Sequence, residues 1–244
     1  MDNFDIYNNR YKSHTDSYSY SGGIKWACSL IKDILKYLDK TDIKTIIDIG
    51  CGEGNKSFLL ADYFKCAEVF AIDFTDEGIK KAINSYSNIN NLYFKKADIF
   101  KMDAKKYDIV SCFEVLEHIE DWESVLKKIC DISNKYILIT VPTGRMRDYE
   151  KYVGHLRNFK KGEIEDFVTN NGFKKIKTFY AGFPFYSPLG RDYLNRNYNG
   201  YNESISGIFT KKQKIFHQML YILFRYFCFK NIGDCFVGLF ERII

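Results

Sequence analysis

Four acidic residues in the first half of the sequence each follow a short apolar run. Asp48 lies in IIDIG, Asp73 in AIDF, Asp98 in ADIF and Glu114 in SCFEV. Carboxylates accept hydrogen bonds from hydroxyl and amino groups, so such a set could hold a ligand rich in both. Taken singly, each carboxylate has a simpler interpretation as a solvated turn residue or a helix cap. Taken together, the four favour one binding site.

A glycine-rich turn follows the first of these runs. The stretch from Ile46 to Asn55 reads IIDIGCGEGN, with glycine at positions 50, 52 and 54. Glycine adopts backbone angles that a side chain forbids, and it lets a ligand approach the main chain. A dinucleotide fingerprint needs glycine where Asn55 stands, which argues against a nicotinamide-dependent dehydrogenase. That enzyme and an ordinary turn with incidental glycines remain the alternatives.

Alternating strands and helices are expected to position these residues. Short apolar runs predict strands at 44–50, 67–72, 92–97, 107–113, 136–141, 173–180 and 234–243. Amphipathic spacing and caps predict helices at 24–38, 55–64, 76–86, 121–130, 161–170 and 215–229. This rhythm indicates an α/β fold, a doubly wound parallel sheet with helices on both faces. Ligands of such sheets bind at the carboxyl ends of the strands, where the four acidic residues would converge.

The composition sets broad limits on the class of protein. A chain of 244 residues with 46% hydrophobic residues is long enough for a full core. The formal net charge of +5 is spread along the chain without a dense basic block, which indicates a solvated surface more than an anionic partner. Seven cysteines without a C-x-x-C pair read as buried thiols in a reducing compartment. The polar N-terminus predicts no secretory signal, so we expect a cytoplasmic protein.

Four motifs together resemble the class I S-adenosylmethionine-dependent methyltransferases, small-molecule branch. They are IIDIGCGEG, AIDF, ADIF and YDIVSCFEVLEHIED, and the resemblance covers about residues 24–180 plus the closing strand. It implies a seven-stranded sheet of order 3-2-1-4-5-7-6 with strand 7 antiparallel. It also implies a domain at 24–244, preceded by a flexible arm or lid at 1–23, with 181–230 as an insertion on the acceptor side.

The resemblance assigns the carboxylates to parts of the cofactor, S-adenosylmethionine. Asp48 would face the cationic amino group, Asp73 would accept both ribose hydroxyls, and Asp98 would accept from the adenine amino group. Phe74 and Ile99 would sandwich the adenine ring. The remaining residues would lie along the methionine part and the transferred methyl group: Gly50, Cys51, Gly52, Cys112, Phe113 and Glu114.

Two histidines are candidates for contact with the acceptor. His155, in GHLRNF, would face the acceptor pocket and is the candidate general base, which is needed only if the acceptor carries a proton. His118, in VLEHI, would be a positioning residue beneath the cofactor. Loop arginines, Arg145, Arg157 and Arg191, could pair with an acidic acceptor, although such arginines are usually solvated. No metal site is predicted.

The leading hypothesis is methyl transfer to an O or N atom of a small molecule. The region after Gly182 is loosely similar to methyltransferases of bacterial surface glycans, which suggests a sugar, sugar nucleotide or amine. A quinone or prenyl acceptor is the alternative, and a non-catalytic S-adenosylmethionine-binding module is a second. Cys112–Val115 lacks the Asn-Pro-Pro-Tyr type motif of enzymes that methylate nucleic-acid bases, so no nucleic-acid partner is expected. The apolar stretch 215–229 would pack on the core or form a homodimer, or else lie at a membrane surface.

Overall fold

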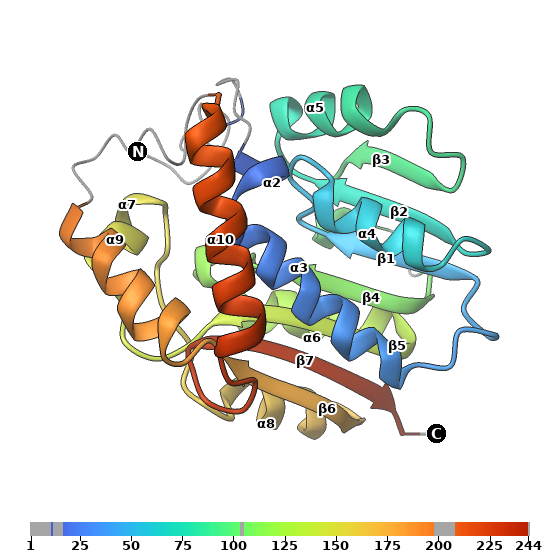
Figure 1. The fold of residues 1–244 in the computed structure, drawn as a ribbon. Coiled ribbons are helices and arrows are strands. Elements are labelled where there is room, and N and C mark those ends of the chain that lie inside the picture. Colours follow the sequence, from blue (N-terminus) through green and yellow to red (C-terminus); the bar gives the residue numbers. More distant parts are fainter. Residues whose placement is uncertain (1–10, 12–16, 103–104, 198–207, 244) are drawn as a thin grey trace.

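A seven-stranded sheet forms the centre of the molecule (Figure 1). The computed structural model describes residues 11, 17–102, 105–197 and 208–243. The strand order is β3-β2-β1-β4-β5-β7-β6, and β7 runs antiparallel to both of its neighbours. The strands are β1 Thr45–Ile49, β2 Glu68–Asp73, β3 Leu92–Lys96, β4 Tyr107–Phe113, β5 Ser133–Pro142, β6 Phe173–Ala181 and β7 Cys235–Arg242. The predicted fold class, strand order and antiparallel strand 7 are confirmed.

The central strands are buried because helices cover both faces of the sheet. Every residue of β4, YDIVSCF, is buried, as expected for a parallel strand with no solvent face. The helices are α2 Ser17–Tyr20, α3 Gly22–Ile34, α4 Asn55–Tyr63, α5 Asp76–Tyr86, α6 Trp122–Ile132, α7 Asp148–Tyr152, α8 Glu163–Asn170, α9 Arg191–Asn197 and α10 Lys211–Phe227. Shorter helical turns are η1 Leu35–Tyr37, η2 Ile99–Lys101, η3 Leu116–His118 and η4 Phe185–Gly190.

Two hydrophobic clusters make up the core, one on each face. Leu30 and Ile34 of α3 and Leu60 of α4 belong to one cluster, whereas Ile129 of α6 and Val168 of α8 belong to the other. In Figure 1, α3 and α4 lie in front of the sheet and α6 and α8 behind it. The sheet is therefore the middle layer of three, which leaves the carboxyl ends of the strands open as one edge.

The helix ends are set by local capping. The Ser21 side chain accepts from the Ile24 N–H, so α3 begins at Gly22, two residues before the predicted start. Asp121 caps α6 by accepting from the Ser124 N–H at 3.3 Å. Both caps use short polar side chains at the first turn of the helix, where backbone donors have no intrahelical partner.

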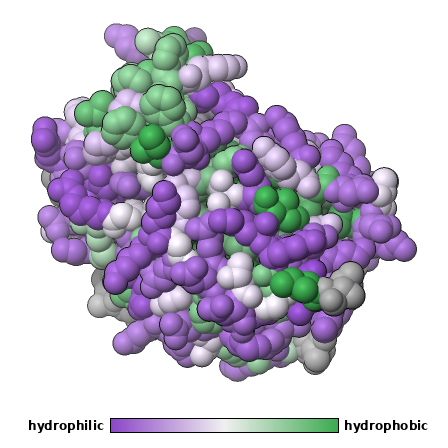
Figure 2. All heavy atoms as spheres, turned by 90° about the horizontal axis from the view of Figure 1, so that it is seen from below, coloured by the Kyte–Doolittle hydropathy of each residue, from purple (hydrophilic) through white to green (hydrophobic). Residues whose placement is uncertain are grey.

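Helix α10 is less buried than its apolar sequence suggests. Phe224 is buried, but the other face exposes Ile215, Met219 and Ile222, with relative exposures of 64%, 63% and 46%. The helix packs on α3 along one side only, so burial against the core is partial (Figure 1). Seen from below, this face is mostly hydrophilic; hydrophobic residues gather at one corner, and smaller hydrophobic patches lie elsewhere on the face (Figure 2).

Several smaller expectations are also resolved. Both tryptophans, Trp26 and Trp122, are core residues with 2% and 6% exposure. The segment 143–159, for which no helix or strand is predicted, contains the short helix α7. All seven cysteines are free thiols; Cys112, Cys130 and Cys235 are buried as expected, whereas Cys66 is exposed and the other three are half-buried. Of the predicted arm, residues 1–10 and 12–16 lie outside the described residues, as do 198–207 of the predicted insertion. None of the described helices combines the length and apolar character needed to cross a bilayer.

Candidate active site

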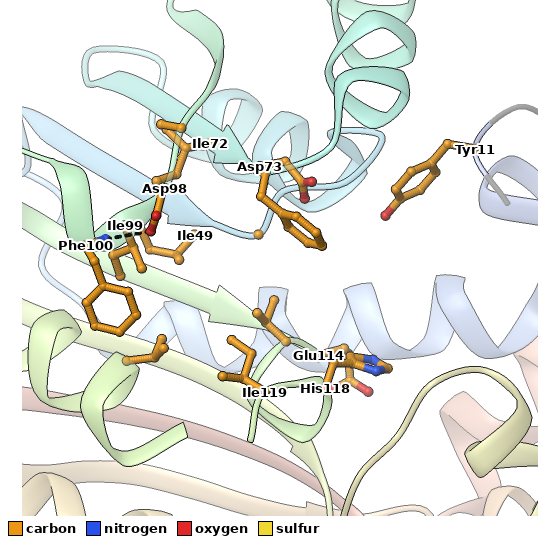
Figure 3. Close-up of a pocket in the computed structure, with 15 residues that line it drawn as sticks. Tyr11, Ile49, Ile72, Asp73, Asp98, Ile99, Phe100, Glu114, His118 and Ile119 are labelled. Carbon is orange, nitrogen blue, oxygen red and sulfur yellow. Dashed lines mark hydrogen bonds between the residues drawn. The ribbon is translucent and has the colours of Figure 1, made fainter. Parts of the chain in front are cut away.

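A cavity of about 410 Å³ opens at the carboxyl ends of β1, β2 and β4 (Figure 3). Its walls are mostly apolar, with carboxylates at separate points along them. The lining residues are Tyr11, Ile49, Gly50, Ile72, Asp73, Phe74, Ala97, Asp98, Ile99, Phe100, Glu114, Val115, His118, Ile119 and Val125. Seven of the predicted site residues lie here: Gly50, Asp73, Phe74, Asp98, Ile99, Glu114 and His118.

The glycine turn forms the floor of the cavity. Gly50 and Gly52 have φ of +72° and +52°, values that side chains rarely adopt. A Cβ at Gly50 would lie 2.5 Å from Val115 Cγ2, and one at Gly52 would lie 2.6 Å from the Tyr11 hydroxyl. Both the conformation and the space therefore require glycine at these two positions.

The Asp73 carboxylate is fixed by its own neighbours. One oxygen accepts from the Gly52 N–H at 2.8 Å, and the other accepts from the Thr75 N–H at 2.8 Å and from the Thr75 hydroxyl at 2.6 Å. Each carboxylate oxygen has more than one acceptor direction, so the side chain can still accept from a diol. This geometry suits the ribose hydroxyls of S-adenosylmethionine.

Asp98 stands at the other end of the cavity, where it caps η2. Its Oδ1 accepts from the Phe100 N–H at 3.0 Å, and the side chain is partly exposed (Figure 3). Ile99 is buried beside it, whereas Phe74 and Phe100 are 45% and 55% exposed. The adenine ring of the cofactor would fit among these apolar groups. Phe100 was missed in the sequence, although it directly follows the Asp98–Ile99 pair.

Asp48 lies beneath the cavity and does not line it. Its two oxygens accept from the Ser57 hydroxyl at 2.6 Å and from the Ser111 hydroxyl at 2.7 Å. Burial raises the pKa of Asp48 to about 6, against the two serine hydrogen bonds that lower it. The predicted residues Cys51, Gly52, Cys112, Phe113 and His155 are likewise absent from the cavity lining.

Glu114 lines the cavity in an unusual backbone conformation. It is the one described residue other than glycine with positive φ, at +58°. Its N–H donates to the Thr140 carbonyl at 2.9 Å, which ties the turn to β5. Non-glycine residues in this region store strain and are frequent at functional sites. Both Glu114 and His118 line the cavity.

His118 and His155 come together although 36 residues separate them in the sequence. Their rings contact edge to face with centroids 4.6 Å apart. Burial lowers the pKa of His155 from its ordinary value of 6.5, although Glu114 and Glu150 act in the opposite direction. Neutral imidazole is therefore the stable form of His155 at neutral pH.

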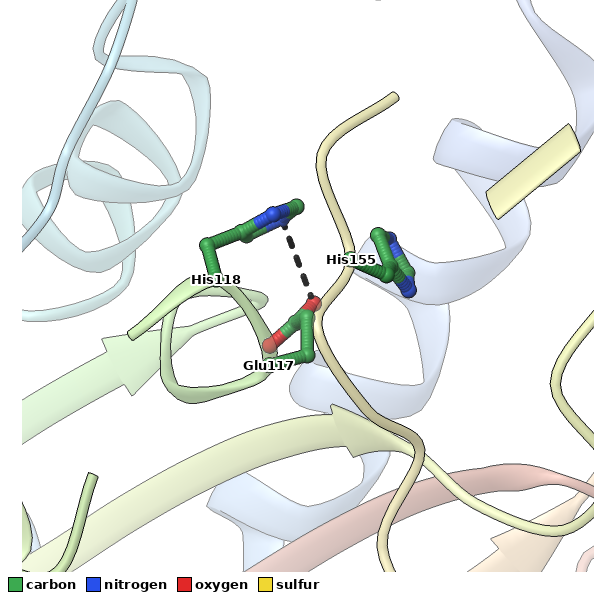
Figure 4. Close-up of side chains that lie close together, drawn as sticks. All are labelled: Glu117, His118 and His155. Atoms are coloured by element: carbon green, nitrogen blue, oxygen red, sulfur yellow. Dashed lines mark ion pairs between the residues drawn. The ribbon is translucent and has the colours of Figure 1, made fainter. Parts of the chain in front are cut away.

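Glu117 completes this group and was missed in the sequence (Figure 4). It is fully buried, and its Oε1 lies 3.8 Å from His118 Nε2. Burial, together with the charge of Glu114, holds the pKa of Glu117 well above its ordinary value. The sequence places Glu117 directly before His118 in VLEHI, and this adjacency could have marked Glu117 as a site residue.

An ion-pair network supports the loop that carries His155. Buried Arg191 pairs with buried Glu150, and Arg147 pairs with Asp192 at 2.5 Å and with Asp234 at 3.7 Å. Glu150 also accepts from the Arg147 N–H at 2.7 Å. These contacts join the segment after β5 to α9 and to the residue before β7.

The three arginines considered for an acidic acceptor are all engaged within the protein. Arg191 is only 3% exposed, contrary to the usual solvated state of loop arginines, and it pairs with Glu150. Arg145 pairs with Asp192 at 2.7 Å. Arg157 donates to the Glu120 carbonyl at 3.0 Å.

The sheet order, the glycine turn and the carboxylate-lined cavity together define a class I S-adenosylmethionine-binding fold. A family model described as a methyltransferase domain matches residues 40–183, so the chain belongs to the methyltransferase domain family. It is an S-adenosylmethionine-dependent methyltransferase. The non-catalytic alternative is thereby set aside.

Two relatives illustrate the sequence similarity. A protein of Invertebrate iridescent virus 6 named as methyltransferase 235L is 30% identical over 208 residues, which cover 82% of this chain and 68% of the relative. The ubiquinone biosynthesis O-methyltransferase of Nitrosomonas europaea is 33% identical over 101 residues. That match covers 38% of this chain and 42% of the relative.

Solved structures show the same fold at low sequence identity. The magnesium protoporphyrin IX methyltransferase of Synechocystis PCC 6803, with bound S-adenosylhomocysteine, superposes with a TM-score of 0.57 at 16% identity. That match covers 91% of this chain and 84% of the other. A Haloferax volcanii methyltransferase in complex with the Trm112 activator gives a TM-score of 0.65 at 15% identity, covering 99% and 96% of the two chains.

Proposed function

We propose that this methyltransferase acts on a hydroxyl oxygen of a small, largely apolar aromatic acceptor of the quinone-precursor type. The observation that carries this proposal is the histidine pair at the edge of an apolar cavity, with His155 held neutral by burial. Support also comes from relatives whose names specify O-methylation in ubiquinone biosynthesis.

The chemistry of such an acceptor matches the groups present. S-adenosylmethionine supplies an activated methyl group, so the protein has chiefly to orient the acceptor and exclude water. An aromatic hydroxyl has a pKa of about 10, as in tyrosine, and carries a proton at neutral pH. His155, being neutral, is able to accept that proton, and His118 would orient the acceptor or the ring of His155.

A sugar, sugar nucleotide or amine for a surface glycan is the second candidate acceptor. It rests on the loose likeness of the region after Gly182 to glycan methyltransferases. A sugar nucleotide would bring phosphate charge, which arginines bind well. The three loop arginines already have partners within the protein. Arg145 pairs with Asp192, Arg157 donates to the Glu120 carbonyl, and Arg191 pairs with Glu150. The sugar-nucleotide candidate therefore has less support.

We also propose that α10 contacts a membrane surface, from which a prenylated acceptor would be taken. Ile215, Met219, Ile222 and Tyr226 follow one another at spacings of three or four residues, and each is at least 46% exposed. The helix begins with Lys211 and Lys212, whose charge suits anionic lipid headgroups. A homodimer through the same face is the competing arrangement.

An acceptor panel tests the proposed substrate class. Purified protein would be given labelled S-adenosylmethionine with polyprenyl and short-chain catechol or quinol precursors, sugar nucleotides, free sugars and amines, and products identified by mass spectrometry. We expect a methyl ether on an aromatic hydroxyl, and a large loss of turnover with unchanged cofactor affinity for His155→Gln. Methylated sugars or amines with no aromatic product would overturn the proposal.

Vesicle sedimentation tests the membrane contact. Wild-type protein should bind vesicles that contain anionic lipid, and Met219→Glu should release it. A matched control is Ile83→Glu, an exposed apolar residue of α5 on another part of the surface. Protein that ignores vesicles but elutes as a dimer, and becomes monomeric with Met219→Glu, would establish the homodimer instead.

A further inference from the structure

We propose that Glu117, His118 and His155 bind one divalent transition-metal ion, of the Zn²⁺ type, at the acceptor edge of the cavity. One ligand atom from each residue lies within 4.8 Å of the others (Figure 4). Glu117 and His118 come from η3, and His155 comes from the loop after α7. The site would thus join two segments that are distant in sequence.

The buried Glu117 side chain is the strongest indication that this cluster can bind a cation. It is fully buried, and neither of its oxygens has a hydrogen-bond partner among the described residues. A buried carboxyl group, charged or protonated, is nearly always hydrogen-bonded, paired or bound to a metal. His118 Nε2, 3.8 Å away, is too distant for a hydrogen bond.

The tautomer of His118 is set for metal binding. Its Nδ1 lies 2.9 Å from the Gly154 carbonyl oxygen, which only accepts, so Nδ1 carries the proton. The lone pair is then on Nε2, the atom that faces Glu117. Metal-binding histidines usually donate their other N–H to a carbonyl or carboxylate in this way.

A similar chain of contacts sets the tautomer of His155. The Asn158 side-chain NH₂ donates to Glu150 Oε2 at 3.1 Å and to the Arg145 carbonyl at 3.3 Å. This leaves Asn158 Oδ1 as an acceptor, 3.4 Å from His155 Nδ1. His155 Nδ1 therefore carries the proton, and Nε2 has the lone pair.

The spacing and the donor set both suit a transition metal. In a tetrahedral site with bonds of about 2.0–2.1 Å, ligand atoms lie roughly 3.3 Å apart. The 3.8 Å between Glu117 and His118 is close to this value, so a small side-chain movement would close the site. Two imidazoles and one carboxylate are typical ligands of zinc and of ferrous iron. Three protein ligands would leave a fourth tetrahedral position for water or substrate.

The roles of His155 as base and as metal ligand exclude each other. The lone pair of Nε2 can accept a proton or bind an ion, but not both. With a metal bound, the ion itself would polarise the acceptor oxygen. The metal site does not depend on the proposed acceptor, since binding is measured without one.

Metal titration of the full-length protein tests the proposal directly. Protein stripped with EDTA would be titrated with Zn²⁺ by calorimetry and with Co²⁺ by visible absorbance, which reports imidazole coordination. We expect one equivalent to bind, and Glu117→Gln to lose binding. His217→Gln is the control, because His217 lies on α10 away from the cluster and should leave the stoichiometry unchanged.

A variant of Asn158, which contacts His155 but is not itself a proposed ligand, guards against loss of folding. Asn158→Ala should weaken metal affinity about 10- to 100-fold, since it removes the acceptor that orients His155. S-adenosylhomocysteine affinity, measured in parallel, would verify that each variant is folded. Stripped wild-type protein that shows no saturable binding of either metal would overturn the site, as would equal binding by wild type and Glu117→Gln. A protein that binds metal but methylates no aromatic acceptor would uphold the site and reject the proposed acceptor.

Discussion

Carboxylates that end successive strands of this sheet have different environments, and their burial explains the difference. Asp73 is buried but retains acceptor capacity toward the cavity, whereas Asp98 is partly exposed. Asp48 is enclosed by two serine hydroxyls. The same residue type near the end of a strand therefore lines the cavity, caps a helical turn or supports the interior.

Asp73 provides the most direct test of the cofactor site. Asp73→Asn should weaken S-adenosylhomocysteine binding by about 1.5–3 kcal/mol, because hydrogen bonds to a charged acceptor are lost. Calorimetry would measure this, and Asp76→Asn is the control, since Asp76 pairs with Lys96 at the surface. Unchanged affinity would show that Asp73 does not contact the ribose. Thermal unfolding would report any loss from placing an amide N–H against Gly52.

Replacement of Asp48 by asparagine should stabilise the folded protein to a degree that depends on pH. Its pKa in the folded protein, about 6, lies above the ordinary 3.8. Its contribution to stability is thus full below the unfolded pKa and is lost as the pH rises through 6. Asp48→Asn should raise the free energy of unfolding at pH 8 by up to about 3 kcal/mol. Urea unfolding should show the gain shrinking between pH 6 and pH 4; a gain that does not vary with pH would contradict this origin.

Residue types alone could identify the carboxylates of the cavity, because strand ends meet at one edge of a parallel sheet. They could not reveal Glu117 as a fully buried group, since its burial depends on the loop after α7 folding over η3. The ion pairs of Arg147 and Arg191 were hidden for the same reason: their partners, among them Asp234, are distant in sequence.

At the scale of elements, the packing of α10 on α3 depends on one glycine. A Cβ at Gly22 would lie 2.4 Å from the His217 carbonyl oxygen and 2.9 Å from Leu220 Cβ. The two helices therefore approach closely where α3 begins. Local periodicity predicted both helices, but it could not show that α10 would keep a large apolar face exposed.

Gly22→Ala should destabilise the protein, and Gly23→Ala is a matched control one residue away. The first change forces a methyl group into α10 and should cost about 1–3 kcal/mol. At Gly23 the nearest atom to an added Cβ is 3.6 Å away, so alanine should be neutral or stabilising by about 0.5–1 kcal/mol. Chemical denaturation would measure the free energy of unfolding of both variants. Equal changes in the two variants would show that contact between α3 and α10 is not the cause.

At the scale of the whole molecule, the N-terminal region reaches the cofactor site. Tyr11 is 6% exposed and lines the cavity (Figure 3). A Cβ at Gly52 would lie 2.6 Å from its hydroxyl. The sequence predicted a flexible arm or lid at 1–23. Tyr11 supplies a contact with the cavity that such a lid would need. The sequence around Tyr11 has no helical or strand periodicity, so it could not identify this residue as part of the cavity wall.

Tyr11→Ala should accelerate dissociation of S-adenosylhomocysteine, because it removes a ring that closes one wall of the cavity. Stopped-flow displacement would measure the rate, with Tyr37→Ala as control because Tyr37 is 53% exposed on η1. A dissociation rate that stays the same in the Tyr11 variant would mean that this wall does not restrict exchange.

The position of β7 between β5 and β6 affects how the chain matures during synthesis. On the ribosome, β5 and β6 emerge long before Arg242, so each has an unsatisfied edge until the last strand inserts between them. Unpaired edges are templates for intermolecular pairing. Nascent chains stalled shortly before Cys235 should therefore depend on chaperones, and completion of the sheet becomes the step that commits the newborn enzyme to its folded form or to aggregation.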